Sequence, residues 1–589
     1  MATFDDLLVE AGGFGLYQRR VFLLIYLTSA TFSWLYLGFV FLAVTPDHWC
    51  RSPGVSELRE KCNWTLDQEK NYTLPAGHPG ISSYSQCERF DLDWNSSSVS
   101  CDNPLPFAQN HSRDLPLTRC QDGWVFENGS ISSIVTEFEL VCADAWKVDL
   151  PQACLNLGFM VGTIILGYAA DIFGRKSCFL FATFVTAASG LPLAFAPSYP
   201  WFVILRTLQG LFSRGGWLSA QILMTELVVS EHRRRAGILN QMCFSFGIMV
   251  LPAVAYFIPA WRNLQLIITV PNILFLTYYW LIPESPRWMV SQRKEAEAVK
   301  VLRQVAARNG SYLSRTARVT DVPLHAQIGH NRGTLHRQLG TIIIEKDDGQ
   351  VTRPSVLDLV RTPRMRKHTL ILMINWFTCA LVYQGLVMRL GTLGGNIYLD
   401  FFISGAVEIP ASVIVLLVIE RIGRRLPFAT GGLLSGVSCL IAAFIPENKY
   451  HSDYILWLKT AVTSLGRLGI TVTMEMVCFV NTELYPTFLR SFAVSMCSSL
   501  SDLGGIVSPF IVFRLAALWL EMPLVVFGVI GLVSGGLVLL LPETKGLSLP
   551  DTIEEIENIS RWKRNTLKTT YQKVVLHSTT PTHSASSNL

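Results

Sequence analysis

The chain has 589 residues, of which 50% are hydrophobic and 16% are charged, and its formal net charge is +5. Soluble domains carry about 25% charged residues, so this composition excludes an ordinary soluble globular protein and indicates a protein of the lipid bilayer. The basic residues form no groove or nucleic-acid-binding motif, which excludes a nucleic-acid partner.

Twelve apolar runs are long enough to span a membrane, which takes roughly 20 largely apolar residues per helix. They lie near residues 21–44, 150–170, 178–197, 201–228, 236–259, 263–282, 369–391, 397–419, 427–445, 455–480, 488–515 and 521–541. The first run is too long and too aromatic for a signal peptide and lacks a cleavage site, so we expect an uncleaved transmembrane helix at 21–44 after a cytosolic segment at 1–20. Arg- and Lys-rich loops fall on one side of these runs, which predicts that both termini are cytosolic.

Residues 45–147, between the first two predicted helices, are expected to form an extracellular domain. Six of the thirteen cysteines lie there: Cys50, Cys62, Cys87, Cys101, Cys120 and Cys142. Five glycosylation sequons accompany them, at Asn63, Asn71, Asn95, Asn110 and Asn128. An even number of cysteines in an oxidising compartment predicts three disulfide bonds, but six cysteines allow fifteen pairings and the sequence does not choose among them. The sequons at Asn309 and Asn558 fall on the cytosolic side and are expected to be chance matches.

The two halves of the chain repeat three short motifs. Asp171-Ile-Phe-Gly-Arg-Lys176 is echoed by Glu420-Arg-Ile-Gly-Arg-Arg425; Thr225-Glu-Leu227 with Arg233 recurs as Thr482-Glu-Leu484 with Arg490; and Pro283-Glu-Ser285 recurs as Pro542-Glu-Thr544. A duplicated six-helix unit resembles the major facilitator superfamily, whose loop signature is similar to the first motif. We therefore expect an all-α membrane protein with the major facilitator fold: helices 2–6 at 148–282, a partly helical cytosolic loop at 283–368, helices 7–12 at 369–541, and a mostly disordered cytosolic tail at 542–589.

The charged residues of these motifs are candidate gates. We expect them to form cytosolic ion pairs between the two bundles that break when the carrier opens to the inside, although they could merely anchor loops at the lipid headgroups. They are Asp171, Arg175, Glu226, Arg233, Glu284, Glu420, Arg424, Glu483, Arg490 and Glu543.

Ionisable residues away from the helix ends are candidates for the substrate site, because each costs at least ~2.5–3 kcal/mol in a bilayer. They are Glu408, Glu475 and Asp502, with Arg214 as the one conspicuous cation. Three acids against one base would attract a cation and repel an anion. A buried acid could instead pair with Arg214 or bond to a neighbouring helix, and we expect Arg214 to pair with Asp502 in the empty carrier and to be displaced by substrate.

Aromatic residues are expected to face these acids, because cation–π contacts contribute ~0.5–2 kcal/mol per ring. The repeat offset places Trp217 and Phe244 at the depths of Glu475 and Asp502. Further candidates are the rings of Tyr36, Trp376, Tyr383 and Tyr398, with the amides of Gln241 and Gln384. Each aromatic residue could equally pack or face lipid.

The chain resembles the organic cation transporters of the solute carrier class over nearly its whole length. The matching segments include Thr45-Pro-Asp-His48, Ser133-Ile-Val-Thr-Glu-Phe138, Pro283-Glu-Ser-Pro-Arg-Trp288, Asn481-Thr-Glu-Leu-Tyr-Pro486 and Leu541-Pro-Glu-Thr-Lys-Gly546. Within that class, Val387-Met-Arg-Leu390, Phe401-Phe-Ile-Ser-Gly405 and Tyr256-Phe-Ile-Pro259 are most similar to the extraneuronal monoamine transporter type. The resemblance implies polyspecific facilitated diffusion of monoamines and quaternary ammonium compounds across the plasma membrane. It also implies that Trp217, Phe244, Trp376, Tyr383, Glu408, Glu475 and Asp502 line the cavity.

Two features depart from that family. Ser501 stands before Asp502 where cysteine is frequent, and residues 321–350 are longer than expected and contain the run Thr341-Ile-Ile-Ile344. The substrate range could therefore differ.

Other classes of function find little support. We find no metalloprotease or serine-hydrolase motif and no cluster of metal ligands, so we expect no enzyme, cofactor or metal. The segment 167–177 imitates a phosphate-binding loop with the wrong glycine spacing. A receptor role for residues 45–147 would not need acids inside the membrane. Two alternatives stay open, coupled carnitine or zwitterion transport and organic anion exchange. A homo-oligomer is also possible. The expected partners are small organic cations and the bilayer.

Overall fold

The structure is a computed structural model that describes residues 8–77, 84–92, 94, 101, 116–127, 132–311, 359–390, 396–445, 452–486, 489–545, 550 and 553–558. The sequons at Asn95, Asn110 and Asn128, the long insert at 321–350 and most of the tail lie outside these residues.

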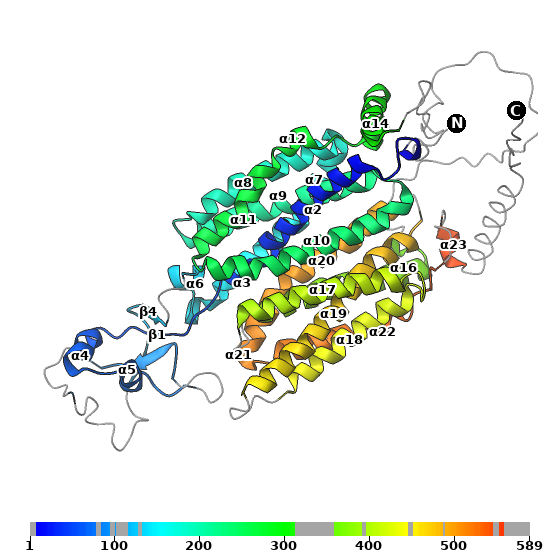
Figure 1. Cartoon of the computed structure of the whole chain (residues 1–589). Coiled ribbons are helices and arrows are strands. Elements are labelled where there is room, and N and C mark those ends of the chain that lie inside the picture. Colours follow the sequence, from blue (N-terminus) through cyan, green and yellow to red (C-terminus); the bar gives the residue numbers. More distant parts are fainter. Residues whose placement is uncertain are drawn as a thin grey trace, which may run out of the picture.

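Two groups of long helices lie side by side and make up most of the molecule (Figure 1). The first bundle contains α2 (Leu16–Leu37), α3 (Phe39–Leu42), α7 (Leu150–Phe173), α8 (Arg175–Ala194), α9 (Tyr199–Glu226), α10 (Ser230–Phe257), α11 (Trp261–Phe275) and α12 (Tyr278–Leu281). The second bundle contains α16 (Pro363–Arg389), α17 (Ile397–Val418), α18 (Arg425–Ala443), α19 (Ser452–Leu484), α20 (Arg490–Phe510), the π-helix η4 (Ile511–Leu515), α21 (Ala516–Leu518) and α22 (Met522–Val538). The bundles meet where α10 packs on α17 and where α7 packs on α20.

Ten helices of the described part are long and apolar enough to cross a membrane. α22 is a shorter apolar helix of 17 residues, and α9 has 28 residues but carries Arg206 and Arg214. Large apolar side chains such as Ile164, Phe184 and Trp280 are exposed on the outside of the bundles. An apolar surface of this extent indicates contact with lipid.

The first helix begins earlier than the sequence predicts. Its expected start at residue 21 follows the polar Gln18-Arg19-Arg20, yet α2 begins at Leu16. The backbone N–H of Tyr17 donates to the Asn309 side chain at 3.0 Å, so a residue 292 positions away supplies the hydrogen-bond partner of one free N–H group in the first turn. The same side chain donates to Gln18 and to the carbonyl of Ala11. Asn309 ends α14 (Glu295–Asn309), which follows α13 (Pro286–Ser291).

The sequence repeat is present as repeated geometry. Gly174 and Gly423 both have positive φ angles, +100° and +105°, which glycine adopts without steric cost. In each half the arginine that follows the glycine donates from Nε to a glutamate at 3.2 Å, Arg175 to Glu226 and Arg424 to Glu483. The two turns therefore share the same glycine conformation and the same arginine–glutamate hydrogen bond.

A second glutamate closes each turn from the end of its bundle. Glu284 accepts a hydrogen bond from the backbone N–H of Lys176 at 3.0 Å, and Glu543 accepts from those of Arg424 and Arg425 at 2.9 and 3.0 Å. A Cβ atom on Gly174 would come within 2.5 Å of the Glu284 carboxylate. Each glycine thus gives its glutamate room to approach the backbone.

Most of the candidate gating residues bond within one bundle, which corrects the expectation that they pair across the interface. Asp171 and Glu226 bind Arg175, and Glu483 binds Arg424, so these pairs join neighbouring helices of the same half. Arg233 and Arg490 donate to the backbone carbonyls of Thr225 and Tyr485. The repeat positions residues relative to their own bundle, and it carries no information about contacts between bundles.

Ion pairs join the two bundles at both ends of their interface. Glu420, after α17, pairs with Arg234 of α10 at the end near α14. At the opposite end, near the disulfide-linked domain, Arg514 of η4 donates to Asp149 at 3.0 Å (Figure 1). Asp149 is completely buried. Neither Arg234 nor the Asp149–Arg514 pair was among the predicted gates.

Substitution of Glu543 or of Glu284 is expected to lower the stability of the bundle that contains that glutamate, by a similar amount in the two cases. Hydrogen bonds to a charged group contribute about 1.5–3 kcal/mol, so Glu543→Ala and Glu284→Ala should each lower the melting temperature of the purified protein, whereas the exposed Glu297→Ala should not. Burial opposes ionisation, but N–H donors and Arg424 hold the pKa of Glu543 below its usual value. Its contribution should be present above that usual pKa and be lost as pH falls through the lowered one. Equal melting of Glu543→Ala and the wild type would contradict this role.

A small disulfide-linked domain lies at one end of the first bundle (Figure 1). It contains α4 (Val55–Cys62) and α5 (Leu66–Thr73), the antiparallel pairs β1 (His48–Cys50) with β4 (Trp124–Phe126) and β2 (Glu88–Phe90) with β3 (Leu117–Arg119), and then α6 (Ile134–Glu137) and the 3-10 helix η1 (Cys142–Val148). Its bridges are Cys50–Cys120, Cys62–Cys101 and Cys87–Cys142, which confirms three disulfides from the six predicted cysteines. Asn63 and Asn71 are exposed.

Candidate functional site

The candidate site residues gather in the middle of the interface between the bundles. Arg214 and Trp217 come from α9, and Glu408, Glu475 and Asp502 come from α17, α19 and α20. Each of these acids is at most 8% exposed. Charges so deeply buried require partners, and their partners decide which charge is left for a ligand.

Arg214 and Asp502 face each other across the bundle interface. The guanidinium Nη2 lies 4.0 Å from the Asp502 carboxylate. The guanidinium carbon also lies 4.8 Å from the Trp217 ring centre and 5.9 Å from that of Phe159. Arg214 therefore rests on an aromatic platform of its own bundle while it reaches the acid of the other.

Glu408 is held by an arginine that the sequence interpretation missed. Arg467 of α19 donates from Nε to Glu408 at 3.1 Å and packs with its guanidinium carbon 3.6 Å from the Tyr383 ring centre. The hydroxyl of Tyr383 donates to the same carboxylate at 2.9 Å. The centre therefore holds three acids and two bases, and the predicted count of three acids and one base is wrong. An arginine in the middle of the run 455–480 was visible in the sequence, and a full count of charges would have found it.

Glu408 also ties the two bundles together. Ser245 of α10 donates to its second oxygen at 2.8 Å, and Glu408 itself is 0% exposed. In this conformation a ligand has no access to Glu408. Its predicted contact with substrate is therefore replaced here by a closed network with Arg467, Tyr383 and Ser245.

Other buried cations were also missed, and they lie toward the helix ends. Arg206 of α9 donates to the carbonyl of Leu35 at 3.1 Å and to Gln209 at 3.2 Å. In the second bundle, Lys459 and Arg389 approach Glu521 at 2.5 and 3.2 Å. These residues join helices near one end of each bundle.

Glu475 is the acid of the central group whose charge is not matched. Ser412 donates to one of its oxygens, and the other is buried with no hydrogen-bond partner. Among the described residues, no ion pair within 4.0 Å includes Glu475. The pairs Arg214–Asp502 and Arg467–Glu408 cancel, so Glu475, when it is ionised, leaves one net negative charge in the centre.

An aromatic wall of the first bundle completes the site. Phe32 of α2 is its centre, with ring centres 5.6 Å from Trp217, 6.3 Å from Phe244 and 6.3 Å from Tyr36. The sequence predicted these three partners but missed Phe32 itself and Phe159, which lies 5.5 Å from Tyr36. Their spacing resembled ordinary apolar packing and gave no separate signal.

The remaining predicted residues are not all at this depth. Trp376 and Gln384 lie on α16 with Tyr383 and are buried, and the backbone carbonyl of Gln241 on α10 accepts from Ser245. Tyr398, in contrast, packs at the end of α17 against Phe41 at 5.7 Å and Tyr256 at 5.4 Å, away from the central acids. This corrects its place in the predicted site.

Three comparisons relate the chain to known proteins. The family described as Sugar (and other) transporter matches residues 146–557. The chain is 48% identical to human solute carrier family 22 member 2, over 97% of this chain and 98% of the relative. It is 50% identical to rat solute carrier family 22 member 3, over 95% of this chain and 96% of the relative. In fold it is similar to the xylose transporter XylE, a major facilitator superfamily proton:xylose symporter, with a TM-score of 0.51 and 16% identity over 92% of this chain and 100% of that chain. The expected major facilitator fold is confirmed, and the chain belongs to solute carrier family 22.

Proposed function

We propose that the protein carries structurally diverse organic cations, such as monoamines and quaternary ammonium compounds, across the plasma membrane by facilitated, sodium-independent, potential-driven transport. The observation that carries this proposal is the unmatched carboxylate of Glu475, in a central group whose Arg214 rests on the aromatic wall. A monovalent cation would neutralise that single charge and place its poorly hydrated faces against the rings. An anion would find no free cation among the central ion pairs.

Movement of the substrate requires that the site open to one side at a time. The ion pairs Arg234–Glu420 and Arg514–Asp149 tie opposite ends of the bundle interface, and opening either end would break one of them. At the centre, a bound cation would compete with Arg214 for Asp502, which lies 4.0 Å away across the interface. The shared design of the two turns at Gly174 and Gly423 would keep each bundle rigid while it rocks.

The proposed topology has twelve transmembrane helices, with α9 and α22 added to the ten most apolar ones. Both termini would be cytosolic, and the disulfide-linked domain would be extracellular and glycosylated. The exposed Asn63 and Asn71 are suited to carry glycans there.

Membrane potential alone would concentrate the substrate. One charge that crosses 100 mV gains ~2.3 kcal/mol, which corresponds to roughly fifty-fold accumulation of a monovalent cation. No second ion is needed for that result.

Voltage-clamp recording in cells that express the chain tests this function. Tetraethylammonium in sodium-free medium should evoke a saturable inward current that grows at negative potentials, and Asp502→Asn should weaken it. Glu297→Gln, which removes an exposed acid of α14, should leave the current unchanged. No current in cells with the protein at their surface would overturn the proposal, and uptake that requires sodium or a pH gradient would favour coupled carnitine or zwitterion transport.

A further inference from the structure

The first helix of the first bundle is interrupted near the end that faces the disulfide-linked domain. α2 ends at Leu37 and α3 begins at Phe39, so Gly38 belongs to neither helix. The backbone N–H groups of Phe41 and Leu42 both donate to the Gly38 carbonyl, at 3.0 and 3.2 Å. Inside a bilayer the backbone groups that such an interruption leaves free need other partners, because no water is present to bond to them. The side chains that supply these partners therefore fix where the helix bends.

Two buried side chains from neighbouring helices bind carbonyls in the last turn of α2. Arg206 of α9 donates to the carbonyl of Leu35 at 3.1 Å. Gln152 of α7 donates to the carbonyl of Tyr36 at 3.3 Å. Arg206 is 0% exposed, and in the described part of the chain its hydrogen bonds go to neutral groups. Its charge lies at the carboxyl end of α2, where the helix dipole stabilises a cation. Its guanidinium carbon also lies 5.7 Å from the ring centre of Phe39, so Arg206 contacts the chain on both sides of the interruption.

The part of α2 that precedes the interruption is anchored to α10. The indole N–H of Trp34 donates to the carbonyl of Gly247 at 2.8 Å. The two helices also approach each other closely, since a Cβ atom on Gly247 would lie 2.1 Å from the carbonyl oxygen of Ala30. A change in the direction of the chain is therefore confined to Gly38 and the residues next to it.

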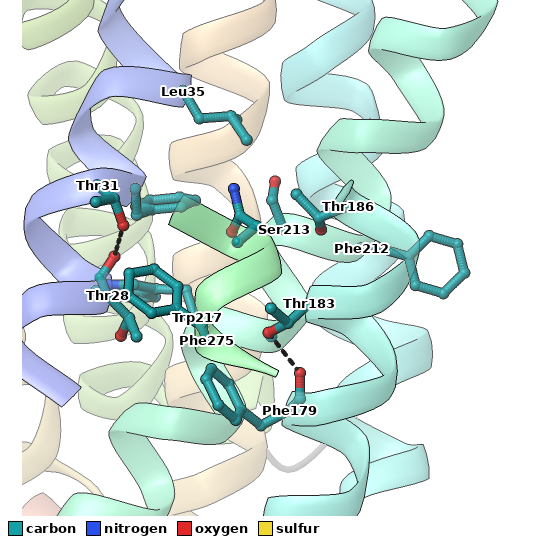
Figure 2. Close-up of a pocket in the computed structure, with 13 residues that line it drawn as sticks. Thr28, Thr31, Leu35, Phe179, Thr183, Thr186, Phe212, Ser213, Trp217 and Phe275 are labelled. Carbon is teal, nitrogen blue, oxygen red and sulfur yellow. Dashed lines mark hydrogen bonds between the residues drawn. The ribbon is translucent and has the colours of Figure 1, made fainter. Parts of the chain in front are cut away.

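The last turns of α2 have some free space on the side that faces α8 and α9. A small cavity of about 30 Å³ lies there, and Thr28, Thr31 and Leu35 line it one after another along α2 (Figure 2). This volume holds about two water molecules. It is too small for a substrate, but it leaves the turn that carries Leu35 room for a small displacement.

Beyond the interruption, α3 reaches the second bundle. The ring centre of Phe41 lies 4.9 Å from that of Phe401 and 5.7 Å from that of Tyr398, and both partners belong to α17. The contact lies at the end of the bundles that faces the disulfide-linked domain, where the Arg514–Asp149 pair also joins them (Figure 1). Three rings of two bundles thus close the interface at this end.

We propose that α3 is an outer gate of the cation pathway, that it bends at Gly38, and that Arg206 is the residue that positions it. This inference rests on the proposed function. Closure brings Phe41 onto α17, and opening parts these rings while Arg206 keeps its contact with the carboxyl end of α2. Tyr36 of the aromatic wall stands two residues before Gly38. A cation that orders the ring of Tyr36 therefore also orders the base of the gate.

Loss of the ring contacts should shift the carrier toward the state that is open on the outer side. For tetraethylammonium uptake, Phe41→Ala should therefore lower KM about five-fold and lower the maximal rate as well, because fewer carriers reach the inner side. Arg206→Met should act in the same direction, and Arg206→Lys should recover part of the change, because lysine keeps the charge but lacks the guanidinium fork. The double variant of Phe41→Ala with Arg206→Met should match the single variants, since both remove one contact. Phe195→Ala, which removes an exposed ring at the end of α8, is the control.

Photocrosslinking in the purified full-length protein tests the geometry without transport. The photoreactive analogue p-benzoylphenylalanine in place of Phe41 should attach to α17 within residues 398–401, and the yield should fall several-fold in Arg206→Met. Gly38→Ala should retain this adduct but lower the maximal rate, since alanine is less flexible than glycine.

Four results would each overturn the gate: adducts confined to the first bundle, a yield that does not depend on Arg206, an unchanged KM in Phe41→Ala, or an unchanged maximal rate in Gly38→Ala. Adducts on α17 that depend on Arg206, in a protein that carries no organic cation, would support the gate geometry and reject the proposed function.

Discussion

Glu475→Gln is expected to lower the ratio of maximal rate to KM for tetraethylammonium by about 100-fold. Loss of one partner from a buried charge pair costs about 2–5 kcal/mol, and each 1.4 kcal/mol corresponds to about a factor of ten. The charges of Arg214 and Asp502 cancel, and so do those of Arg467 and Glu408. The substitution would therefore leave the central site neutral before the cation enters.

Radiotracer uptake and voltage-clamp current, both normalised to protein at the cell surface, measure this effect. Glu475→Asp keeps the charge and should recover part of the rate, whereas Glu297→Gln removes a charge from the exposed face of α14 and should change nothing. If Glu475→Gln carried tetraethylammonium at the wild-type rate, the unmatched carboxylate would not be the counter-charge of the substrate.

Arg467→Met should destabilise the folded protein more than Glu543→Ala or Glu284→Ala. It leaves Glu408 completely buried without a cationic partner, and breaking a buried ion pair from one side costs about 3–5 kcal/mol. The melting temperature of the purified protein and the fraction that reaches the cell surface should both fall. Arg303→Met, which replaces an exposed arginine of α14, is the control.

The double variant Arg467→Met with Glu408→Gln separates charge from packing. Removal of both charges should restore most of the stability, because no buried charge is then left unpaired. It should not restore transport if the Glu408 network is also needed to join α10 to α17 through Ser245. Equal melting of Arg467→Met and the wild type would show that the ion pair contributes nothing to the fold.

The sequence was sufficient for the fold because its signals are local or periodic. Apolar runs mark the helices within about six residues, and the two glycine turns with their glutamates identify a duplicated bundle. The start of α2 was misplaced because its capping group, Asn309, comes from a distant part of the chain. Disulfide pairing was equally out of reach, since it depends on how the loop folds.

The site was predicted less completely than the fold. The acids and most of the rings that gather at the bundle interface were among the predicted residues, because charges in a bilayer are rare and therefore conspicuous. Which acid remains unmatched depends on contacts such as Arg467–Glu408, between residues 59 positions apart, and no spacing rule supplies these. Tyr398 was misplaced for a related reason: a ring near the end of an apolar run gives no indication of its depth.

The separate ties at the two ends of the bundle interface bear on the electrical behaviour of the cell. On the proposed mechanism, Arg514–Asp149 would stay intact while Arg234–Glu420 is released, and the reverse, so the passage would not be open from end to end. Small inorganic ions would then have no route through the protein. A cell can hold many copies in its membrane without short-circuiting the voltage that drives accumulation of the substrate.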